Sequence, residues 1–402
     1  MKRVYFHIGL HKTGTTYLQQ LLRANRKALR REGVFYAGGK GLPNQVFAVW
    51  DLLGRRPQGE GDARIAGSWQ GLVDAVSADD DPVVMLSDEH LSLATAKQAA
   101  TAVEAFGDRE PHVVVTARDL ARTLGSAWQE EIKNRGAWTW AEFSAAVRDP
   151  RGAGTNPARG FWLRQDLPAI LGVWARSVPV ERIHVVTVPP AGAPAGALVQ
   201  RLGSVVGFDP AELTREAPWA NETIGVVGTE LVRRLNPMLT ELPQRQYDRA
   251  IKRTVVRLLA ERTAPVRFAL PPDDLAWARG RGAEMVAAVR TGGYPVVGDL
   301  ADLLSDDLAG PGSAPDRLPD RTSSDEVLAD ALQALAGLAE QYVELWWETR
   351  GPEEPVEADT RARGISQARA LAFKGRRAAA RLADRNPVAG RALGAVLRRR
   401  ST

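Results

Sequence analysis

The sequence predicts an α/β protein in which a parallel β-sheet is covered by helices on both faces. Short apolar runs rich in valine, typical of buried strands, occur at residues 4–8, 82–86, 112–117 and 183–188. Stretches with apolar residues at helical spacing separate these runs, as the connections of a parallel sheet require. The chain has 402 residues, of which 44% are hydrophobic and 25% charged, so it can bury a core of this kind.

The elements are predicted in order along residues 1–305, which we expect to form one α/β domain. The first strand leads into a glycine-bounded loop and then a helix, because Tyr17, Leu18, Leu21 and Leu22 recur at helical spacing. Residues 33–36 form a further short apolar run, and residues 293–300 are expected to pack back on the body. Apolar spacing predicts further helices at residues 95–106, 120–135, 138–150, 160–177, 195–206 and 245–262.

Beyond residue 305 the composition changes. Residues 306–324 are rich in Asp, Gly, Pro and Ser and are predicted to be a linker. A helix is predicted at residues 325–350, and residues 351–402 form a basic tail with amphipathic spacing. Four tryptophans follow the third predicted strand, and we expect them to pack in the core; the alternative is that they line an acceptor cleft (Trp128, Trp138, Trp140 and Trp162).

The loop after the first strand has the composition of a phosphate-binding site. Gly9 and Gly14 bound it and let the backbone approach an anion, while Lys12 adds a positive charge. Thr15 and Thr16 provide hydroxyl donors at the start of the helix. The spacing Gly9-x4-Gly14 matches a Walker A loop, but Thr15 stands where that loop carries its lysine. A turn with a solvated lysine is the alternative interpretation.

The run Lys12-Thr13-Gly14-Thr15-Thr16 directly after a strand resembles the 5′-phosphosulfate-binding loop of sulfotransferases that use 3′-phosphoadenosine 5′-phosphosulfate (PAPS). The resemblance covers roughly residues 1–305. It implies a P-loop-like sulfotransferase fold, PAPS as the sulfate donor and no requirement for a metal. It also implies that Lys12 acts at the transferring group, and that the aromatic residue after the threonines, here Tyr17, stacks on the adenine.

A second element of the same family follows the third predicted strand. Arg118 leaves the strand and Ser126 lies eight residues later on the next helix, which resembles the family's 3′-phosphate-binding element. An arginine fork can bind a phosphate with two hydrogen bonds while a serine hydroxyl completes the shell. The alternative is an Arg118 paired with Asp119 or Glu130. The family's adenosine-contacting loop has a candidate at residues 219–222, where a plain turn is the other interpretation.

The candidates for a general base follow the second predicted strand. Glu89 is the first choice, because carbohydrate-type sulfotransferases use a glutamate; His90 is the second and Asp88 the third. These residues could instead cap the following helix. The clusters at 11–16, 87–90 and 118–126 all follow strands, so they should meet at the carboxyl edge of the sheet.

The charge distribution and the cysteine content indicate which partners and which cellular compartment to expect. Residues 361–402 carry 12 Lys and Arg against one acidic residue, so this segment has a net charge of +11 and the rest of the chain −6. Because the excess positive charge is confined to this segment, residues 1–360 are not expected to bind nucleic acid. The segment itself is a candidate for contact with an anionic membrane. The absence of cysteine, of a leader segment and of a long apolar run predicts a cytoplasmic protein. The five histidines show no metal-ligand spacing.

These observations predict a sulfotransferase that moves a sulfuryl group from PAPS to a hydroxyl of a glycan, glycolipid or small metabolite. One alternative is a P-loop nucleotide kinase or nucleoside-triphosphatase, which would need the missing Gly-Lys-Ser/Thr. Another is a non-catalytic nucleotide-binding protein. The sequence predicts neither the acceptor nor the oligomeric state.

Overall fold

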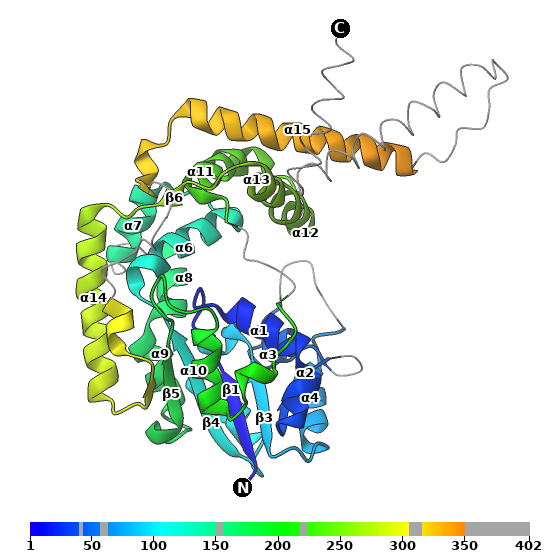
Figure 1. Ribbon diagram of the computed structural model, residues 1–402, viewed down its shortest axis with the longest axis vertical. Helices are drawn as coiled ribbons and strands as arrows, with labels where there is room; N and C mark the ends of the chain where they lie inside the picture. The colour runs from blue at the N-terminus through cyan, green and yellow to red at the C-terminus, as the bar shows by residue number, and fades with distance from the viewer. Residues whose placement is uncertain (40–42, 57–62, 150–155, 218–222, 305–315, 350–402) are drawn as a thin grey trace, which may run out of the picture. The chain divides into compact units, whose positions relative to one another are not determined.

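A six-stranded parallel sheet forms the centre of the computed structural model, with strand order β2-β3-β1-β4-β5-β7 (Figure 1). The structure describes residues 1–39, 43–56, 63–149, 156–217, 223–304 and 316–349. Parallel pairing holds across the whole sheet, so the predicted fold class is confirmed. The strands are β1 (Arg3–His7), β2 (Val34–Tyr36), β3 (Val83–Ser87), β4 (Glu110–Ala117), β5 (Ile183–Thr187) and β7 (Val296–Val297).

Strands with apolar residues on both faces require cover on both faces, and each face has its own core. In β1, Val4 and Phe6 face one core and Tyr5 the other. The first core packs under α3 (Gln45–Leu52), α4 (Ser68–Ser77), α5 (Ala96–Glu104) and α9 (Leu167–Trp174). The second packs under α1 (Thr15–Ala24), α2 (Arg26–Arg31) and α10 (Ala197–Val206).

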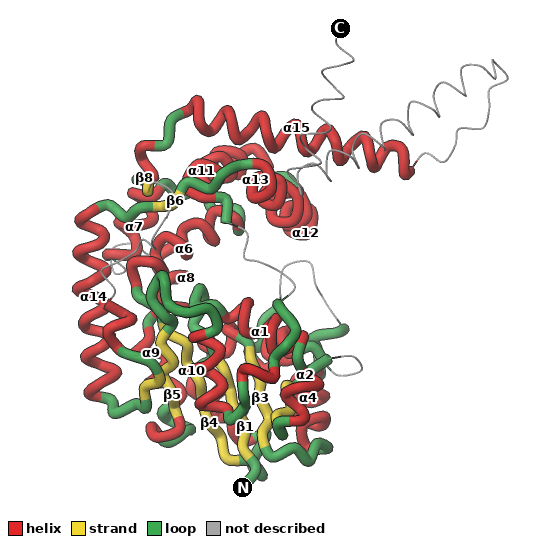
Figure 2. Tube along the Cα trace, in the orientation of Figure 1, coloured by secondary structure: helices red, strands yellow, loops and turns green. Residues whose placement is uncertain are grey.

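A third core is built mainly from helices, with Leu270 and the ring of Phe268 also contributing. It contains Trp128 and Trp140, which are 1% and 2% exposed, with Trp138 and Trp162 packed against it. The prediction that these tryptophans pack in the core is therefore confirmed. The helices are α6 (Leu120–Lys133), α7 (Trp140–Arg148), α8 (Asn156–Gln165), α11 (Gly225–Leu235), α12 (Gln244–Tyr247), α13 (Val256–Arg262), α14 (Pro272–Thr291) and, through Val327 and Ala334, α15 (Ser324–Thr349). They form the helical part beside the sheet in Figure 2.

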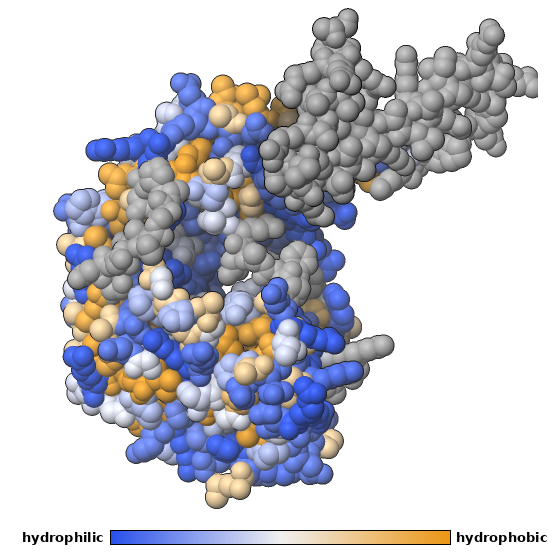
Figure 3. Space-filling view, in the orientation of Figure 1, coloured by the Kyte–Doolittle hydropathy of each residue, from blue (hydrophilic) through white to orange (hydrophobic). Residues whose placement is uncertain are grey.

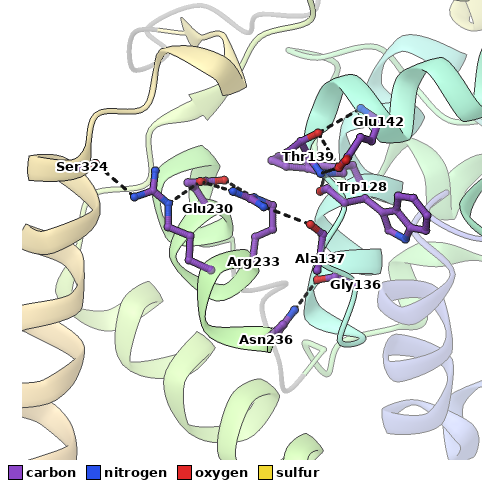
Figure 4. Close-up of polar contacts among 11 residues, drawn as sticks. Trp128, Gly136, Ala137, Thr139, Glu142, Glu230, Arg233, Asn236 and Ser324 are labelled. Atoms are coloured by element: carbon purple, nitrogen blue, oxygen red, sulfur yellow. Dashed lines mark hydrogen bonds and ion pairs between the residues drawn. The ribbon is translucent and has the colours of Figure 1, made fainter. Parts of the chain in front are cut away.

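Polar contacts fix α11 to the connection between α6 and α7 (Figure 4). Arg233 on α11 donates from Nη1 to the carbonyl of Ala137 at 3.2 Å. Asn236, just after α11, donates from Nδ2 to the carbonyl of Gly136 at 2.6 Å. These bonds satisfy carbonyls that follow the end of α6, and they hold this helix against the rest of the helical part.

Two predicted segments differ in detail from the structure. Residues 245–262, predicted as one amphipathic helix, contain a π-helical stretch at Asp248–Val255 between α12 and α13. There the Thr254 hydroxyl donates to the carbonyl of Arg249, five residues back, at 2.9 Å. Residues 293–300 do pack on the body, as expected, and they contribute the edge strand β7.

The end of the chain is described only in part. Residues 306–315 of the expected linker lie outside the described residues, whereas β8 (Asp316–Arg317) pairs with β6 (Arg267–Phe268). The predicted helix at 325–350 corresponds to α15 (Ser324–Thr349). The tail from residue 350 onward lies outside the described residues. By its internal contacts the chain divides into two units, Met1–Ala339 and Glu340–Thr402, and the sheet lies in the first.

The remaining short elements are 3₁₀ turns at Glu89–Leu93 (η1), Val180–Arg182 (η2), Pro210–Glu212 (η3), Asn236–Leu239 (η4), Leu300–Leu304 (η6) and Pro319–Arg321 (η7). Among the helices that the structure describes, none is both long and apolar enough to cross a bilayer.

Candidate functional site

The loop between β1 and α1 has the backbone shape of an anion-binding turn. Gly9, Lys12 and Gly14 all have left-handed conformations, with φ values of 94°, 64° and 83°. Such a conformation is uncommon for a residue with a side chain, so its presence at Lys12 marks a constrained position. A Cβ on Gly9 would also lie 3.0 Å from the Cβ of Glu89, which explains why glycine is needed there.

Hydrogen bonds to β4 hold the start of this loop. The N–H groups of Ile8 and Leu10 donate to the carbonyls of Val114 and Thr116 at 3.0 and 2.7 Å. The buried Thr13 hydroxyl donates to the carbonyl of Leu10 and lies 2.7 Å from the Thr116 hydroxyl. The Thr13 side chain therefore shapes the loop, and the part of Thr13 left for a ligand is its N–H group.

The backbone N–H groups at the turn are available to a ligand. Those of residues 11–14 donate to no other group in the part of the chain that the structure describes. They precede the first turn of α1, where Thr15 is buried, Thr16 is exposed and Tyr17 is 38% exposed. Unpaired N–H groups at a helix N-terminus attract anions, so this loop can hold a phosphate-like group.

The side chain of Lys12 extends from the loop to helix α6. Its Nζ lies 3.3 Å from Oε2 of Glu130, and the same oxygen lies 3.3 Å from Nζ of Lys133. Burial lowers the pKa of Lys12 although the Glu130 carboxylate opposes this. Burial would raise the pKa of Glu130, but Lys133, Lys12 and Lys252 outweigh it and bring the pKa to about 2. Glu130 is therefore a carboxylate that neutralises the lysine of the loop.

Arg118, at the end of β4, lies against the same loop. Its Nη1 donates to the carbonyl of Lys12 at 3.3 Å, and its buried Nε has no hydrogen-bond partner. Within the described ranges Arg118 forms no ion pair, because Arg122 pairs with Asp119 instead. The alternative pairing of Arg118 with Asp119 or Glu130 is therefore not found. Burial, with Arg122 nearby, lowers the pKa of Arg118 to about 10, so this side chain remains a cation.

Ser126 lies one turn before Glu130 on α6. Its hydroxyl donates to the carbonyl of Arg122 at 2.9 Å, a bond within the helix that leaves the oxygen able to accept or reorient. Because residues four apart share a helix face, Arg122, Ser126 and Glu130 lie along one side of α6. Asp119 caps the helix by accepting from the N–H of Arg122 at 2.8 Å.

The three candidate bases have different surroundings. Asp88 is 2% exposed; it caps η1 and accepts from Nδ1 of His90 at 2.8 Å. Burial opposes protonation of His90, but this bond and the Asp88 charge outweigh it and raise the pKa of His90. Glu89 accepts from Nε2 of Gln19 at 2.7 Å. Asp88 therefore caps the turn and orients His90, which agrees with the alternative interpretation that this cluster caps the following helix. Among the described residues, Oε1 of Glu89 and Nε2 of His90 have no hydrogen-bond partner.

His11 adds an unpartnered atom beside these residues. Its ring lies edge-on to the His90 ring, with centroids 5.6 Å apart, and its buried Nδ1 has no partner. Burial lowers the pKa of His11 to about 3, so the ring is neutral. His7, in contrast, is buried inside the sheet, where its ring nitrogens contact the hydroxyl groups of Ser87 and Thr116.

Most predicted site residues thus meet at the carboxyl edge of β1, β3 and β4. Figure 3 shows the molecule hollowed between the sheet and the helical part, with hydrophilic atoms inside the hollow. Sequence reasoning missed Gln19 and gave Glu130 no role in the site; the spacing of Glu130 from Ser126 is the signal that could have found it. The candidate at residues 219–222 lies outside the described residues. No group of three His, Asp or Glu in the described chain could hold a metal ion.

The fold and this edge define a parallel α/β protein whose first strand leads into a loop with backbone N–H groups that could bind an anion. No protein-family model matches the chain, and no curated protein matches it. Among solved structures, the sulfotransferase from Alicyclobacillus acidocaldarius aligns with 72% of this chain and 95% of its own. The sequence identity is 13% and the TM-score is 0.40.

Proposed function

We propose that this protein is a sulfotransferase that moves a sulfuryl group from PAPS to a hydroxyl of a glycan, glycolipid or small metabolite. The observation that carries the proposal is the hydrogen bond from Arg118 to the carbonyl of Lys12. It supports the proposal because it brings the Arg118 guanidinium against the loop that carries Lys12, 106 residues earlier in the chain. A doubly phosphorylated adenosine needs such a pair, with the loop at its 5′ end and Arg118 with Ser126 at its 3′-phosphate.

In the proposed reaction the acceptor oxygen attacks the sulfur in line with the leaving 5′-phosphate. One S–O bond forms as the other breaks, the acceptor proton passes to a base, and 3′-phosphoadenosine 5′-phosphate leaves. Lys12 and the free N–H groups of the loop would stabilise charge that develops on the leaving oxygen. Thr15 and Thr16 would bind the 5′-phosphate, and Tyr17 would contact the adenine.

Two residues could accept the proton. Glu89 remains the first candidate, and its packing against Gly9 supports a place beside the loop. The Asp88–His90 pair supports the second: Nδ1–H of His90 donates to Asp88, which would leave Nε2 as the acceptor. The variants Glu89→Gln and His90→Asn separate the two candidates. The variant that lacks the base should lose most of the transfer rate, and the other variant should keep it.

The decisive test is transfer of labelled sulfate from PAPS to a panel of hydroxyl acceptors. Lys12→Ala should lower the rate about 100-fold or more, because it removes a cation at the developing charge. Lys97→Ala, an exposed lysine on α5, is the matched control and should keep the rate. No transfer by the wild-type chain would contradict the proposal and leave a non-catalytic nucleotide-binding protein.

Calorimetry separates the proposal from a P-loop kinase or nucleoside-triphosphatase. The proposal expects 3′-phosphoadenosine 5′-phosphate to bind and ATP, which lacks the 3′-phosphate, to bind much more weakly. The reverse order would favour the kinase or nucleoside-triphosphatase.

We also propose that residues 361–402 contact an anionic membrane surface near the acceptor. The +11 charge of this segment supports this, since each cation close to such a surface contributes about 1 kcal/mol. Co-sedimentation of the full chain and a 1–355 truncation with anionic liposomes tests it, and equal binding by both would contradict it.

A further inference from the structure

A second cationic pocket lies beside the edge strand β2, on the side of the sheet covered by α2. It has a volume of about 220 Å³ and is lined by Arg26, Lys27, Arg30, Phe35, Tyr36 and Gly39, among others. At about 30 Å³ for each water, this is room for about seven water molecules. The pocket is smaller than the roughly 300–1,000 Å³ of sites for drug-sized ligands, so it suits a single sugar-sized unit.

The charges in this pocket are balanced only in part by the residues that the structure describes. Arg30 pairs with Asp79 and with Asp81, and its guanidinium lies over the Phe35 ring. Arg26 and Lys27, in contrast, form no ion pair within the part of the chain that the structure describes. The pocket therefore has two uncompensated positive charges next to one compensated charge.

Arg26 also lacks hydrogen-bond partners. Its Nε is buried without a partner, and its guanidinium donates to no group among the described residues. It is half-buried and lies over the Tyr36 ring, 5.3 Å from the ring centroid. Burial, with Arg23 nearby, lowers the pKa of Arg26, but an arginine stays charged. A half-buried guanidinium whose buried Nε has no partner needs an explanation, and an oxyanion is the ligand that its planar donors fit.

The backbone is adapted to this side chain. Gly39 has φ of 140°, and a Cβ at this position would lie 3.3 Å from Cζ of Arg26. A residue with a side chain would be strained at this φ, and its Cβ would push the guanidinium away by a few tenths of an ångström. Glycine at this position therefore lets Arg26 lie close to the backbone.

We propose that this pocket binds a compact oxyanion, a sulfate, phosphate or carboxylate, carried on a sugar-sized molecule, with Arg26 and Lys27 as the residues that recognise it. Polar contacts connect the pocket's strand to the strand that carries the candidate bases. Gln45 donates to the carbonyl of Ala37, which follows β2, and its Oε1 accepts from the N–H of Ser87 at 2.6 Å. An acidic unit of the acceptor is therefore the natural occupant, and only this last identification rests on the proposed function.

The test is calorimetric titration of the full chain with glucose 6-sulfate, with glucose and inorganic sulfate as comparison ligands. Saturating 3′-phosphoadenosine 5′-phosphate keeps these anions out of the loop after β1; if that nucleotide does not bind, Lys12→Ala serves the same purpose. Glucose 6-sulfate should bind, and neutral glucose should bind at least tenfold more weakly. Arg26→Gln should weaken the binding of glucose 6-sulfate about tenfold or more, since it removes charge-assisted hydrogen bonds.

Arg31→Gln is the matched control, because Arg31 lies on the same helix with its side chain 72% exposed and outside the pocket lining. It should leave the affinity unchanged. Lys27→Gln should weaken binding, and Arg26→Lys should give an intermediate affinity, so these variants decide the matter if Arg26→Gln does not fold. Wild-type binding that Arg26→Gln leaves unchanged, or no binding at all, would overturn the proposal. Equal affinity for inorganic sulfate would overturn the part that concerns a sugar-sized ligand.

The outcome is separable from that of the proposed function. Arg26→Gln should leave the affinity for 3′-phosphoadenosine 5′-phosphate unchanged, because that nucleotide is assigned to the loop and Arg118. A chain that binds the nucleotide but not the acidic sugar would contradict only the pocket, and the reverse would contradict only the sulfotransferase assignment.

Discussion

Lys12 and Arg118 present their charges in different ways at the residue scale. Lys12 is paired with Glu130, whereas Arg118 forms no ion pair among the described residues and keeps an unpartnered Nε. An anion can therefore bind to Arg118 without displacing a carboxylate, but it must compete with one for Lys12. The two ends of the proposed donor should respond differently to substitution.

Replacing Arg118 should affect the 3′-phosphate alone. We expect Arg118→Ala to weaken the binding of 3′-phosphoadenosine 5′-phosphate about ten- to hundredfold, as the loss of hydrogen bonds between charged groups predicts. Binding of adenosine 5′-phosphate, which lacks the 3′-phosphate, is the control and should not change. Calorimetry with both nucleotides measures this, and an equal loss for the two would mean that Arg118 acts through the loop.

Replacing Glu130 should strengthen nucleotide binding. In Glu130→Gln the lysine no longer has to leave a carboxylate, so we expect the Kd for 3′-phosphoadenosine 5′-phosphate to fall several-fold. Glu131→Gln removes the same charge one residue away without touching Lys12, and its effect should be smaller. Combining Glu130→Gln with Lys12→Met should abolish the gain. An unchanged or higher Kd in Glu130→Gln would show that the pair holds Lys12 ready for the nucleotide.

At the scale of elements, a buried carboxylate joins α7 to α14. Asp274 on α14 is 6% exposed; it accepts from Nε1 of Trp140 at 2.8 Å and from the Ser144 hydroxyl at 2.5 Å. It also lies 3.1 Å from Nη1 of Arg148. The helical core therefore contains a polar connection in which every donor depends on one residue.

Removing this carboxylate should destabilise the fold. We expect Asp274→Ala to lower the free energy of unfolding by about 3 kcal/mol, because two buried donors and one arginine lose their acceptor. Asp273→Ala, the exposed neighbour in the same helical turn, should cost less than about 1 kcal/mol. Urea denaturation followed by circular dichroism compares them, and similar losses would rule out the connection as a source of stability.

For the whole molecule, buried histidines should make stability depend on pH. Burial lowers the pKa of His7 to about 4, that of His11 to about 3 and that of His184 to about 4. In the unfolded chain these groups protonate near pH 6.5. Between pH 6.5 and about 4 the unfolded state therefore binds more protons, and the free energy of unfolding falls as the pH falls. His7, which is 0% exposed, contributes on the order of 3 kcal/mol over this range.

The measurement is urea denaturation at several pH values between 7.5 and 4.5. The wild type should lose stability toward the lower end, and His7→Gln, which cannot titrate, should show a flatter profile whatever its absolute stability. Parallel profiles for the two chains would mean that His7 does not supply the effect.

Local patterns were sufficient for the fold class and for locating the loop and the strand ends that carry the candidate site residues. Valine-rich runs separated by helical spacing predicted the parallel sheet, because a strand covered on both faces must be apolar along its length. The loop was predicted from Gly9, Lys12 and Gly14, since these residue types act through backbone conformation and charge. The two-residue strand β7 was not recognisable as a strand, because such a short element is defined by its partner β5.

The sequence by itself determined the order of strand, loop and helix and the residue types that can bind an anion there. Only the tertiary structure decided which charges pair: Lys12 with Glu130, Asp119 with Arg122, and neither Arg118 nor Arg26 with a carboxylate among the described residues. The physical reason is the distance along the chain over which each effect acts. Backbone preference and amphipathic spacing act over a few residues, whereas the ion pair between Lys12 and Glu130 joins positions separated by 118 residues and depends on how whole elements pack.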